Sequence, residues 1–180
     1  MKKLKLDELN RVSVEDFKKQ KKLPLVLVLD NIRSLNNIGS IFRTADAFSI
    51  NSIYLCGITG TPPHKEIHKT ALGATESVSW RYFENTMGAI NDLKKEGYLI
   101  CGIEQADESL MLNKFNPSKT QPIAFIFGNE VEGIDEAILN FIDIVIEIPQ
   151  FGTKHSLNVA VSVGIIVWDY INKIKNGIVD

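Results

Sequence analysis

Three groups of polar residues, each following an apolar run, could together perform chemistry. Asn37 and Arg43 follow the first run, Glu130 follows a later one, and Ser156 and Asn158 follow the last. An arginine can hold a phosphate or stabilise a developing oxyanion, whereas amide, carboxylate and hydroxyl groups orient a substrate by hydrogen bonding. Alone, each group has an ordinary explanation, since an exposed helical arginine is usually solvated and a Gly-Asn-Glu segment usually forms a turn. Convergence of all three at one place would make a site.

The apolar runs that precede these residues predict a mainly parallel sheet. Residues 25–30 form a continuous apolar run that ends in Asp30, which is typical of a central strand whose carboxyl end faces a ligand. Further strands are expected at 52–55, 78–83, 98–103, 122–127 and 144–148, and helical segments at 38–48, 64–72, 86–96, 135–141 and 157–170. Residues 104–120 are polar and are expected to be partly irregular. This alternation predicts an α/β fold with a mostly parallel sheet of about six strands flanked by helices.

The helix starts matter because they carry the polar residues. Asn36 or Asn37 is available to cap the first helix, from which Arg43 projects off the apolar stripe. Ser156 is the expected N-cap of the last helix, whose apolar residues occupy nearly every face and predict a helix surrounded by protein. Backbone N–H groups at such a start favour a polar or anionic ligand. The simpler alternative is that Ser156 only caps and Asn158 only binds the loop.

Composition predicts one soluble domain with a basic appendage. The chain has 180 residues, 44% hydrophobic and 23% charged, with a formal net charge of -2. Residues 1–23 contain eight basic and four acidic side chains, so the remainder carries -6. We expect an N-terminal arm at 1–23 and a single domain at 24–180. Cys56 and Cys101 lie in or beside apolar runs, which predicts buried thiols in a cytoplasmic protein.

The histidines suggest other chemistry that we disfavour. His64 and His68 are spaced for one helix face but have no third ligand in view, so no metal site is expected. His155 beside Ser156 could indicate a nucleophile and its base. Adjacent side chains diverge, however, and no acid is placed to orient the ring, so we reject a hydrolase.

The three groups, in this order, resemble the motifs of the SpoU-type (TrmH-like) RNA 2′-O-ribose methyltransferases of the SPOUT superfamily. The similarity covers about residues 24–172, and its three motifs are Asn37-x-Gly39-x-x-x-Arg43-Thr-Ala-Asp46-Ala-Phe, Phe127-Gly-Asn-Glu130-x-x-Gly133 and Ile148-Pro149-x-x-Gly152-x-x-x-Ser156-Leu-Asn158-Val-Ala-Val. Gln150 stands where the family usually has methionine. Since the family's cofactor contacts there are largely through the backbone, we expect little loss of function.

The resemblance implies a fold and a site that periodicity alone does not predict. It implies a C-terminal trefoil knot, S-adenosylmethionine held by the knot loops, and a homodimer whose interface helps build the active site. The cofactor-binding residues would be Phe127, Gly128, Asn129, Ile148, Pro149, Gln150, Ser156 and Leu157. The catalytic residues would be Asn37, Arg43, Glu130, Ser156 and Asn158. The absence of a GxGxxG segment after the first strand agrees with this, because a Rossmann methyltransferase would usually carry one.

The implied reaction is methyl transfer to a ribose 2′-hydroxyl in tRNA or rRNA. Because guanidinium is essentially never deprotonated, we expect Arg43 to clamp the phosphate beside the target ribose and favour the alkoxide, with phosphate or water taking the proton. The other four residues would position the ribose, the cofactor and Arg43. A catalytically silent RNA-binding protein remains an alternative, and base methylation is disfavoured because the third motif matches the ribose branch. The short stretch before residue 24 favours tRNA over rRNA, and the basic arm is expected to contact RNA or pack on the dimer.

Overall fold

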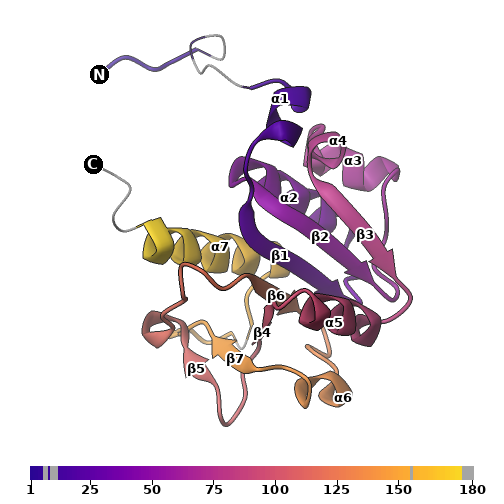
Figure 1. The fold of residues 1–180 in the computed structure, drawn as a ribbon, viewed down its shortest axis with the longest axis vertical. Helices are drawn as coiled ribbons and strands as arrows, with labels where there is room; N and C mark the ends of the chain where they lie inside the picture. The colour runs from indigo at the N-terminus through magenta and orange to yellow at the C-terminus, as the bar shows by residue number, and fades with distance from the viewer. Residues whose placement is uncertain (6–7, 9–11, 155, 176–180) are drawn as a thin grey trace.

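The computed structural model describes residues 1–5, 8, 12–154 and 156–175, and its centre is a parallel sheet (Figure 1). The strand order is β3-β2-β1-β6-β4-β7-β5. β1 (Leu23–Asp30) lies between β2 (Ile50–Cys56) and β6 (Ile123–Phe127), and all recorded strand pairs are parallel. The other strands are β3 (Ser79–Phe83), β4 (Leu99–Ile103), β5 (Leu110–Met111) and β7 (Ile144–Glu147).

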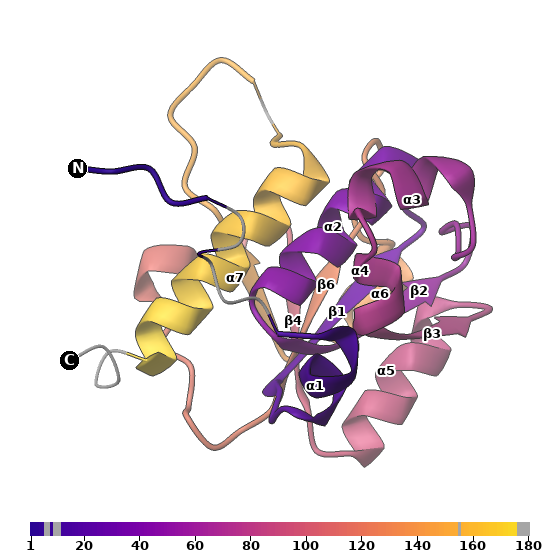
Figure 2. The ribbon, with the colours of Figure 1, turned by 90° about the horizontal axis from the view of Figure 1, so that it is seen from above.

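Helices cover both faces of the sheet (Figure 2). One face carries α2 (Leu35–Ala47) and α7 (Val159–Lys175), which lie side by side, together with α3 (Lys65–Ala71) and α4 (Ala74–Ser77). The other face carries α5 (Thr86–Lys95) and α6 (Glu136–Leu139). The short helix α1 (Val14–Lys19) precedes β1, and the 3-10 helix η2 (Leu112–Lys114) follows β5.

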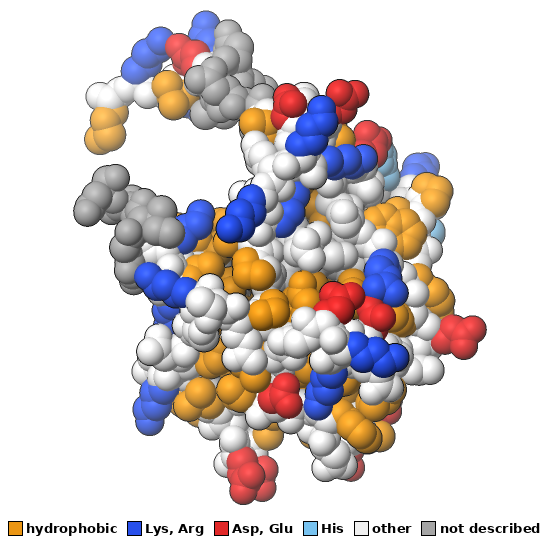
Figure 3. Space-filling model, viewed as in Figure 1, with side chains coloured by type: hydrophobic (Ala, Val, Ile, Leu, Met, Phe, Trp, Pro, Cys, Tyr) orange, Lys and Arg blue, Asp and Glu red, His pale blue; other side chains and the backbone are white. Residues whose placement is uncertain are grey.

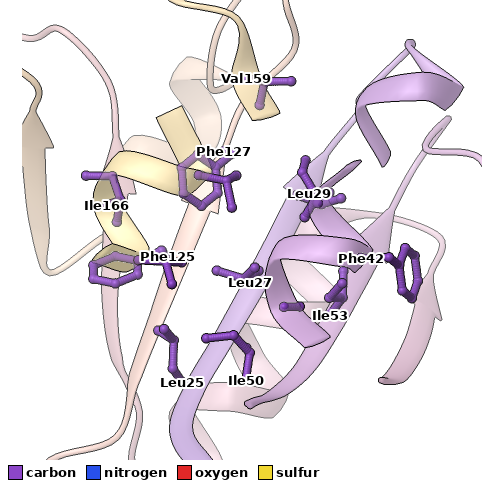
Figure 4. Close-up of a cluster of buried hydrophobic side chains, with 14 of the residues drawn as sticks. Leu25, Leu27, Leu29, Phe42, Ile50, Ile53, Phe125, Phe127, Val159 and Ile166 are labelled. Carbon is purple, nitrogen blue, oxygen red and sulfur yellow. The ribbon is translucent and has the colours of Figure 1, made fainter. Parts of the chain in front are cut away.

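The larger core lies between the sheet and the α2–α7 layer (Figure 4). Successive strand residues point to opposite faces, so Leu25, Leu27 and Leu29 of β1 enter this core. Their neighbours Val26 and Val28 enter the core beneath α5 and α6. A continuous apolar run is thus explained by a strand that is buried on both sides.

Most of the predicted elements are confirmed, but the sheet has seven strands where about six were expected. The additional strand, β5, lies within the segment predicted to be irregular. It has two residues, Leu110 and Met111, which pair with Ile146 and Glu147 of β7. Two residues cannot display a periodicity, so only their pairing with β7 identifies them as a strand.

The predicted caps of α2 and α7 are wrong. Ser34 caps α2, because its hydroxyl accepts a hydrogen bond from the N–H of Asn37. Asn158 occupies the capping position of α7, where its Oδ1 atom accepts from the N–H of Ala160 at 2.9 Å. α7 therefore begins at Val159, directly after Asn158 of the third motif, which is its cap.

α7 is also not surrounded by protein within one chain. Val163, Ile166, Val167 and Tyr170 are buried in the core. The opposite face exposes an apolar stripe, which we call the α7 stripe and define as Val161, Ile165 and Trp168, with exposed fractions of 51%, 36% and 58%. The ring of Trp168 packs against Phe48 with the centroids 6.0 Å apart. None of the helices in the described part of the chain is sufficiently long and apolar to cross a membrane.

Candidate active site

One hydrogen-bonded chain connects the three motifs at the carboxyl edge of the sheet. Asn37 donates from Nδ2 to Oε1 of Glu130 at 3.1 Å. Asn158 donates from its own Nδ2 to Oδ1 of Asn37 at 3.0 Å. These residues follow β1, β6 and β7, and the two hydrogen bonds join residues that are 93 and 121 positions apart along the sequence. The structure thus brings together three of the five expected catalytic residues, because parallel strands end at the same edge.

Glu130 anchors this chain as a carboxylate. Its oxygens also accept the backbone N–H groups of Arg33 at 3.0 Å and Ser34 at 3.1 Å. Burial acts to raise the pKa of Glu130, but the hydrogen bonds from Arg33, Ser34 and Asn37 outweigh it, so the pKa lies below its ordinary value. An ionised carboxylate only accepts hydrogen bonds, which requires the Asn37 amide to present NH₂ to Glu130 and its oxygen to Asn158.

The loop of the second motif is a tight turn that requires its glycines. Asn129 and Gly133 exchange two backbone hydrogen bonds of 2.9 Å. A Cβ atom on Gly128 would collide with the backbone of Gly133 and Ile134, and Gly133 has φ +73°. The Asn129 side chain donates to the carbonyl of Asn31 at 2.8 Å. This loop is therefore fixed to the end of β1.

Glu104, which sequence reasoning missed, supports the same loop. Its Oε2 atom accepts from the N–H of Ile134 at 3.1 Å, and its Oε1 atom accepts from the N–H of Gln105 at 2.8 Å. The available signal was its position, directly after the apolar strand now seen as β4. In the sequence, an acid at this place indicates only the beginning of a polar segment, because its partner lies thirty residues later.

A hollow of about 520 Å³ opens beside this loop, and we call it the loop hollow. Seven of the eight expected cofactor-binding residues line it: Phe127, Gly128, Asn129, Ile148, Gln150, Ser156 and Leu157. Pro149 is not among its lining residues. The hollow is acidic, since its lining includes Glu104, Glu130, Glu132 and Glu136 and, among the residues the structure describes, no lysine or arginine. Its size suits a drug-sized or nucleoside-sized ligand.

Arg43 lies elsewhere within the single chain. It is exposed on α2 and lines a second hollow of about 520 Å³, which we call the α2–α3 hollow. Six residues beyond Asn37, it projects from another side of the helix. Arg43 therefore joins neither the Glu130 chain nor the loop hollow, and Ser156 lines the loop hollow without joining that chain.

The histidines have other placements. The Nδ1 atom of His64 accepts from the N–H of Glu66 at 3.2 Å and caps α3. His155 lies outside the described residues. Within the described ranges, no cluster of three or more histidine, cysteine or acidic side chains could hold a metal ion.

The family comparison agrees with the motif assignment. The model of the SpoU rRNA methylase family matches residues 24–168. The chain belongs to the SpoU rRNA methylase family. This membership confirms the resemblance drawn from the three motifs, all of which lie within the matched range.

Two relatives of this chain illustrate the match. A 23S rRNA (guanosine-2′-O-)-methyltransferase, RlmB, of Neisseria meningitidis is 31% identical over 159 residues, which is 88% of this chain and 62% of the relative. An uncharacterised tRNA/rRNA methyltransferase of Borreliella burgdorferi is 34% identical over 156 residues, which is 87% of this chain and 67% of the relative. The chain thus spans about two thirds of the length of these relatives.

Solved structures of SpoU proteins share the fold. The TrmH/SpoU tRNA modifying enzyme of A. aeolicus superimposes with a TM-score of 0.79 at 24% identity, over 91% of this chain and 83% of that one. The methyltransferase AviRb of Streptomyces viridochromogenes, solved in complex with AdoMet, gives a TM-score of 0.76 at 23% identity over 90% and 65% of the two chains. The α/β fold with a parallel sheet flanked by helices is therefore the one found in these proteins.

Proposed function

We propose that this protein transfers a methyl group from S-adenosylmethionine to a ribose 2′-hydroxyl of a tRNA or rRNA. The observation that carries the proposal is the hydrogen-bonded chain from Glu130 through Asn37 to Asn158, which joins the three family motifs beside the loop hollow. Family membership supports it, as does the similarity to the Neisseria relative, which is named as a 23S rRNA (guanosine-2′-O-)-methyltransferase. A silent RNA-binding protein would not need this polar chain intact.

The loop hollow fits S-adenosylmethionine. Its acidic lining suits a ligand that carries a sulfonium cation, and Gly128 and Asn129 offer backbone groups at its edge. The cofactor supplies both the methyl group and the leaving group, so no metal is required. We assign its binding to the seven lining residues together with neighbouring Pro149. The knot would be formed by the loop at 148–157 and by α7, which follows it.

A homodimer would unite the two hollows. Arg43 and the cofactor residues line separate hollows of one chain, and in the proposed dimer a second copy would supply what each hollow lacks. The α7 stripe offers an apolar surface for that copy, beside the α2–α3 hollow through the contact of Trp168 with Phe48. An isologous contact of this kind is the commonest arrangement of a homodimer.

In the assembled site, each residue would have a positional or electrostatic role. Arg43 would hold the phosphate beside the target ribose and stabilise negative charge on its oxygen, because guanidinium keeps its proton. Asn37, Glu130 and Asn158 would fix the edge against which the ribose lies, and Ser156 would orient the cofactor or the hydroxyl. Phosphate or water would accept the proton.

Arg43→Ala tests this assignment. Calorimetry with S-adenosylmethionine should show an affinity within about twofold of the wild type, whereas methyl transfer to RNA should fall by roughly 10²-fold or more. Arg43→Lys is the matched control, since it keeps the charge but loses the two-pronged geometry, and should retain intermediate activity. Loss of cofactor binding with transfer retained would contradict the role of Arg43. A wild-type protein that binds RNA and methylates none would favour the silent alternative.

The domain division and the RNA identity stay predictions. We propose a methyltransferase domain at 24–180 and a basic arm at 1–23, although Phe17 of α1 is buried and ties part of the arm to the body. Deleting residues 1–12, which spares α1, should weaken RNA affinity and reduce its salt dependence. An unchanged salt slope would assign the arm a structural role. Mapping ribose methylation in tRNA and rRNA of a deletion strain would decide between the two substrates.

A further inference from the structure

The α2–α3 hollow contains a second cation besides Arg43. Lys69 of α3 lines the hollow with Arg43 of α2, and no described residue of the lining is acidic. Neither cation takes part in the ion pairs found within the described ranges. Elsewhere, on the face seen in Figure 3, basic and acidic side chains are interspersed. Although the protein has a net negative charge, these two cations have no acidic side chain beside them in the lining, so the hollow should attract an anion.

Close packing of α3 on α2 fixes the place of Lys69. A Cβ atom on Gly39 would collide with Oγ1 of Thr70 and the carbonyl oxygen of Ile67. Thr70 also donates its hydroxyl proton to the carbonyl of Asn36 at 3.0 Å. Lys69, the residue before Thr70, is thus held on a rigid helix beside Arg43.

The hydroxyls of the hollow are already used. Ser40 donates to the same carbonyl of Asn36 at 2.9 Å, so the hydroxyl protons of Ser40 and Thr70 both point into the helix joint. Among the described charged side chains of the lining, Arg43 and Lys69 remain to meet a ligand. The anion must accordingly be one that is recognised by charge, as a phosphodiester is.

The rim of the hollow carries apolar surface. Leu72 is 67% exposed at the left-handed end of α3, with φ +51°, and Phe48 lies in the lining as well. An inorganic anion would gain nothing from these side chains. A nucleotide would gain from them, because its base or sugar offers an apolar face beside the phosphate.

We propose that Lys69 binds an RNA phosphodiester adjacent to the one held by Arg43, so that the substrate backbone crosses the α2–α3 joint. This inference rests on the proposed function and adds to it a second backbone contact, which sets the path of the strand across the joint. Lys69 touches neither the loop hollow nor the Glu130 chain. Its contribution belongs to RNA binding alone.

The test compares Lys69→Ala with Lys65→Ala. Lys65 lies one turn earlier on α3 and outside the hollow, so its removal changes net charge equally. Binding of unfractionated bacterial tRNA and of total rRNA is measured by filter retention across a range of KCl concentrations. Lys69→Ala should weaken RNA affinity several-fold and reduce the slope of log K against log salt by about 0.7 to 0.9, the value for one lost phosphate contact. Lys65→Ala should leave the slope unchanged, and both variants should bind S-adenosylmethionine like the wild type.

Each other outcome overturns a specific statement. If the two substitutions have equal effects, Lys69 contributes only to the general surface charge and the proposed phosphate contact is wrong. The proposed function is not affected by this outcome. A shift of Lys69→Ala from dimer to monomer in sedimentation would place the hollow in the subunit interface and reject the RNA contact. If the wild type binds the cofactor but neither RNA, the proposed function fails together with this inference.

Discussion

At the scale of single residues, the site depends on the orientation of one amide. Asn37 donates a hydrogen bond to Glu130 and accepts one from Asn158. The side-chain oxygen of Asn158 in turn caps α7. The lowered pKa of Glu130 keeps the first acceptor charged at neutral pH. This chain of hydrogen bonds thus runs from the loop after β6 to the first turn of α7.

Asn37→Asp should break the chain by replacing its donor with a second carboxylate. At pH 7 we expect a loss of about 1 kcal/mol or more in the free energy of unfolding, because two carboxylates would face each other and the Glu130 interaction would be lost. Like charges raise the pKa of a carboxyl, so this loss should shrink as pH falls through those raised values. Urea unfolding at pH 7 and pH 4 measures both effects. Asn36→Asp, on the exposed neighbour, is the control and should stay within about 0.5 kcal/mol of the wild type.

Burial of the two thiols gives a second prediction at this scale. Burial raises the pKa of Cys56 and of Cys101 to about 12, so both should stay protonated throughout the neutral range. A chromogenic disulfide reagent at pH 8 should react with neither thiol in the native protein and with both in denaturant. Rapid reaction of the native protein would contradict their placement in the core.

At the scale of elements, the packing of α3 on α2 positions the side of α2 from which Arg43 projects. Gly39 allows backbone contact between these helices, and Arg43 follows it by one turn. A first motif with glycine at this position therefore serves packing as well as chemistry. The α2–α3 joint sets where Arg43 lies relative to α3.

Gly39→Ala should separate the two helices. The added Cβ meets backbone as well as a side chain, so we expect a loss of about 1–3 kcal/mol in the free energy of unfolding. Gly88→Ala in α5 is the control, since its Cβ would meet atoms no closer than 3.6 Å, and it should stabilise by up to about 1 kcal/mol. Thermal and urea unfolding compare them. A Gly39→Ala variant as stable as the wild type would show that the helices separate without cost.

At the scale of the whole molecule, α7 has two apolar faces and only one of them is buried. The buried face packs on the sheet, where Tyr170 meets Phe125 edge-on with the ring centroids 5.8 Å apart. The other face is the α7 stripe. A single chain therefore leaves uncovered a surface that adjoins the α2–α3 hollow through the contact of Trp168 with Phe48.

Charges on the α7 stripe should dissociate the proposed dimer. The double variant Ile165→Lys, Trp168→Lys should sediment as a monomer and keep its circular dichroism spectrum, because both side chains are partly or largely exposed within one chain. It should also lose methyl transfer if the partner completes the site. Phe141→Lys, which charges another exposed apolar residue, should remain a dimer. If the wild-type protein sediments as a monomer, the α7 stripe is not a dimer interface and the proposed dimer is wrong.

The sequence by itself determined the order and type of most elements. The run at 25–29 is apolar at every position, and this pattern occurs because both faces of β1 are covered. The helix predicted at 86–96 is followed by Gly97, and the φ of +80° at this residue shows why glycine is needed there. The three motifs likewise identified the family, because they are defined by residue types and spacings that can be read directly from the sequence.

Only the tertiary structure decided which residues meet. Asn158, and not the predicted Ser156, caps α7, and a hydrogen bond from Asn158 to Asn37, far away in the sequence, holds it in place. Glu104 likewise meets its partner Ile134 thirty residues later. The separation of Arg43 from the loop hollow also has no linear signal, since it depends on the side of α2 from which each residue projects. Periodicity records burial but not the partner that buries, so the sequence predicted an all-apolar α7 and could not distinguish its core face from its exposed stripe.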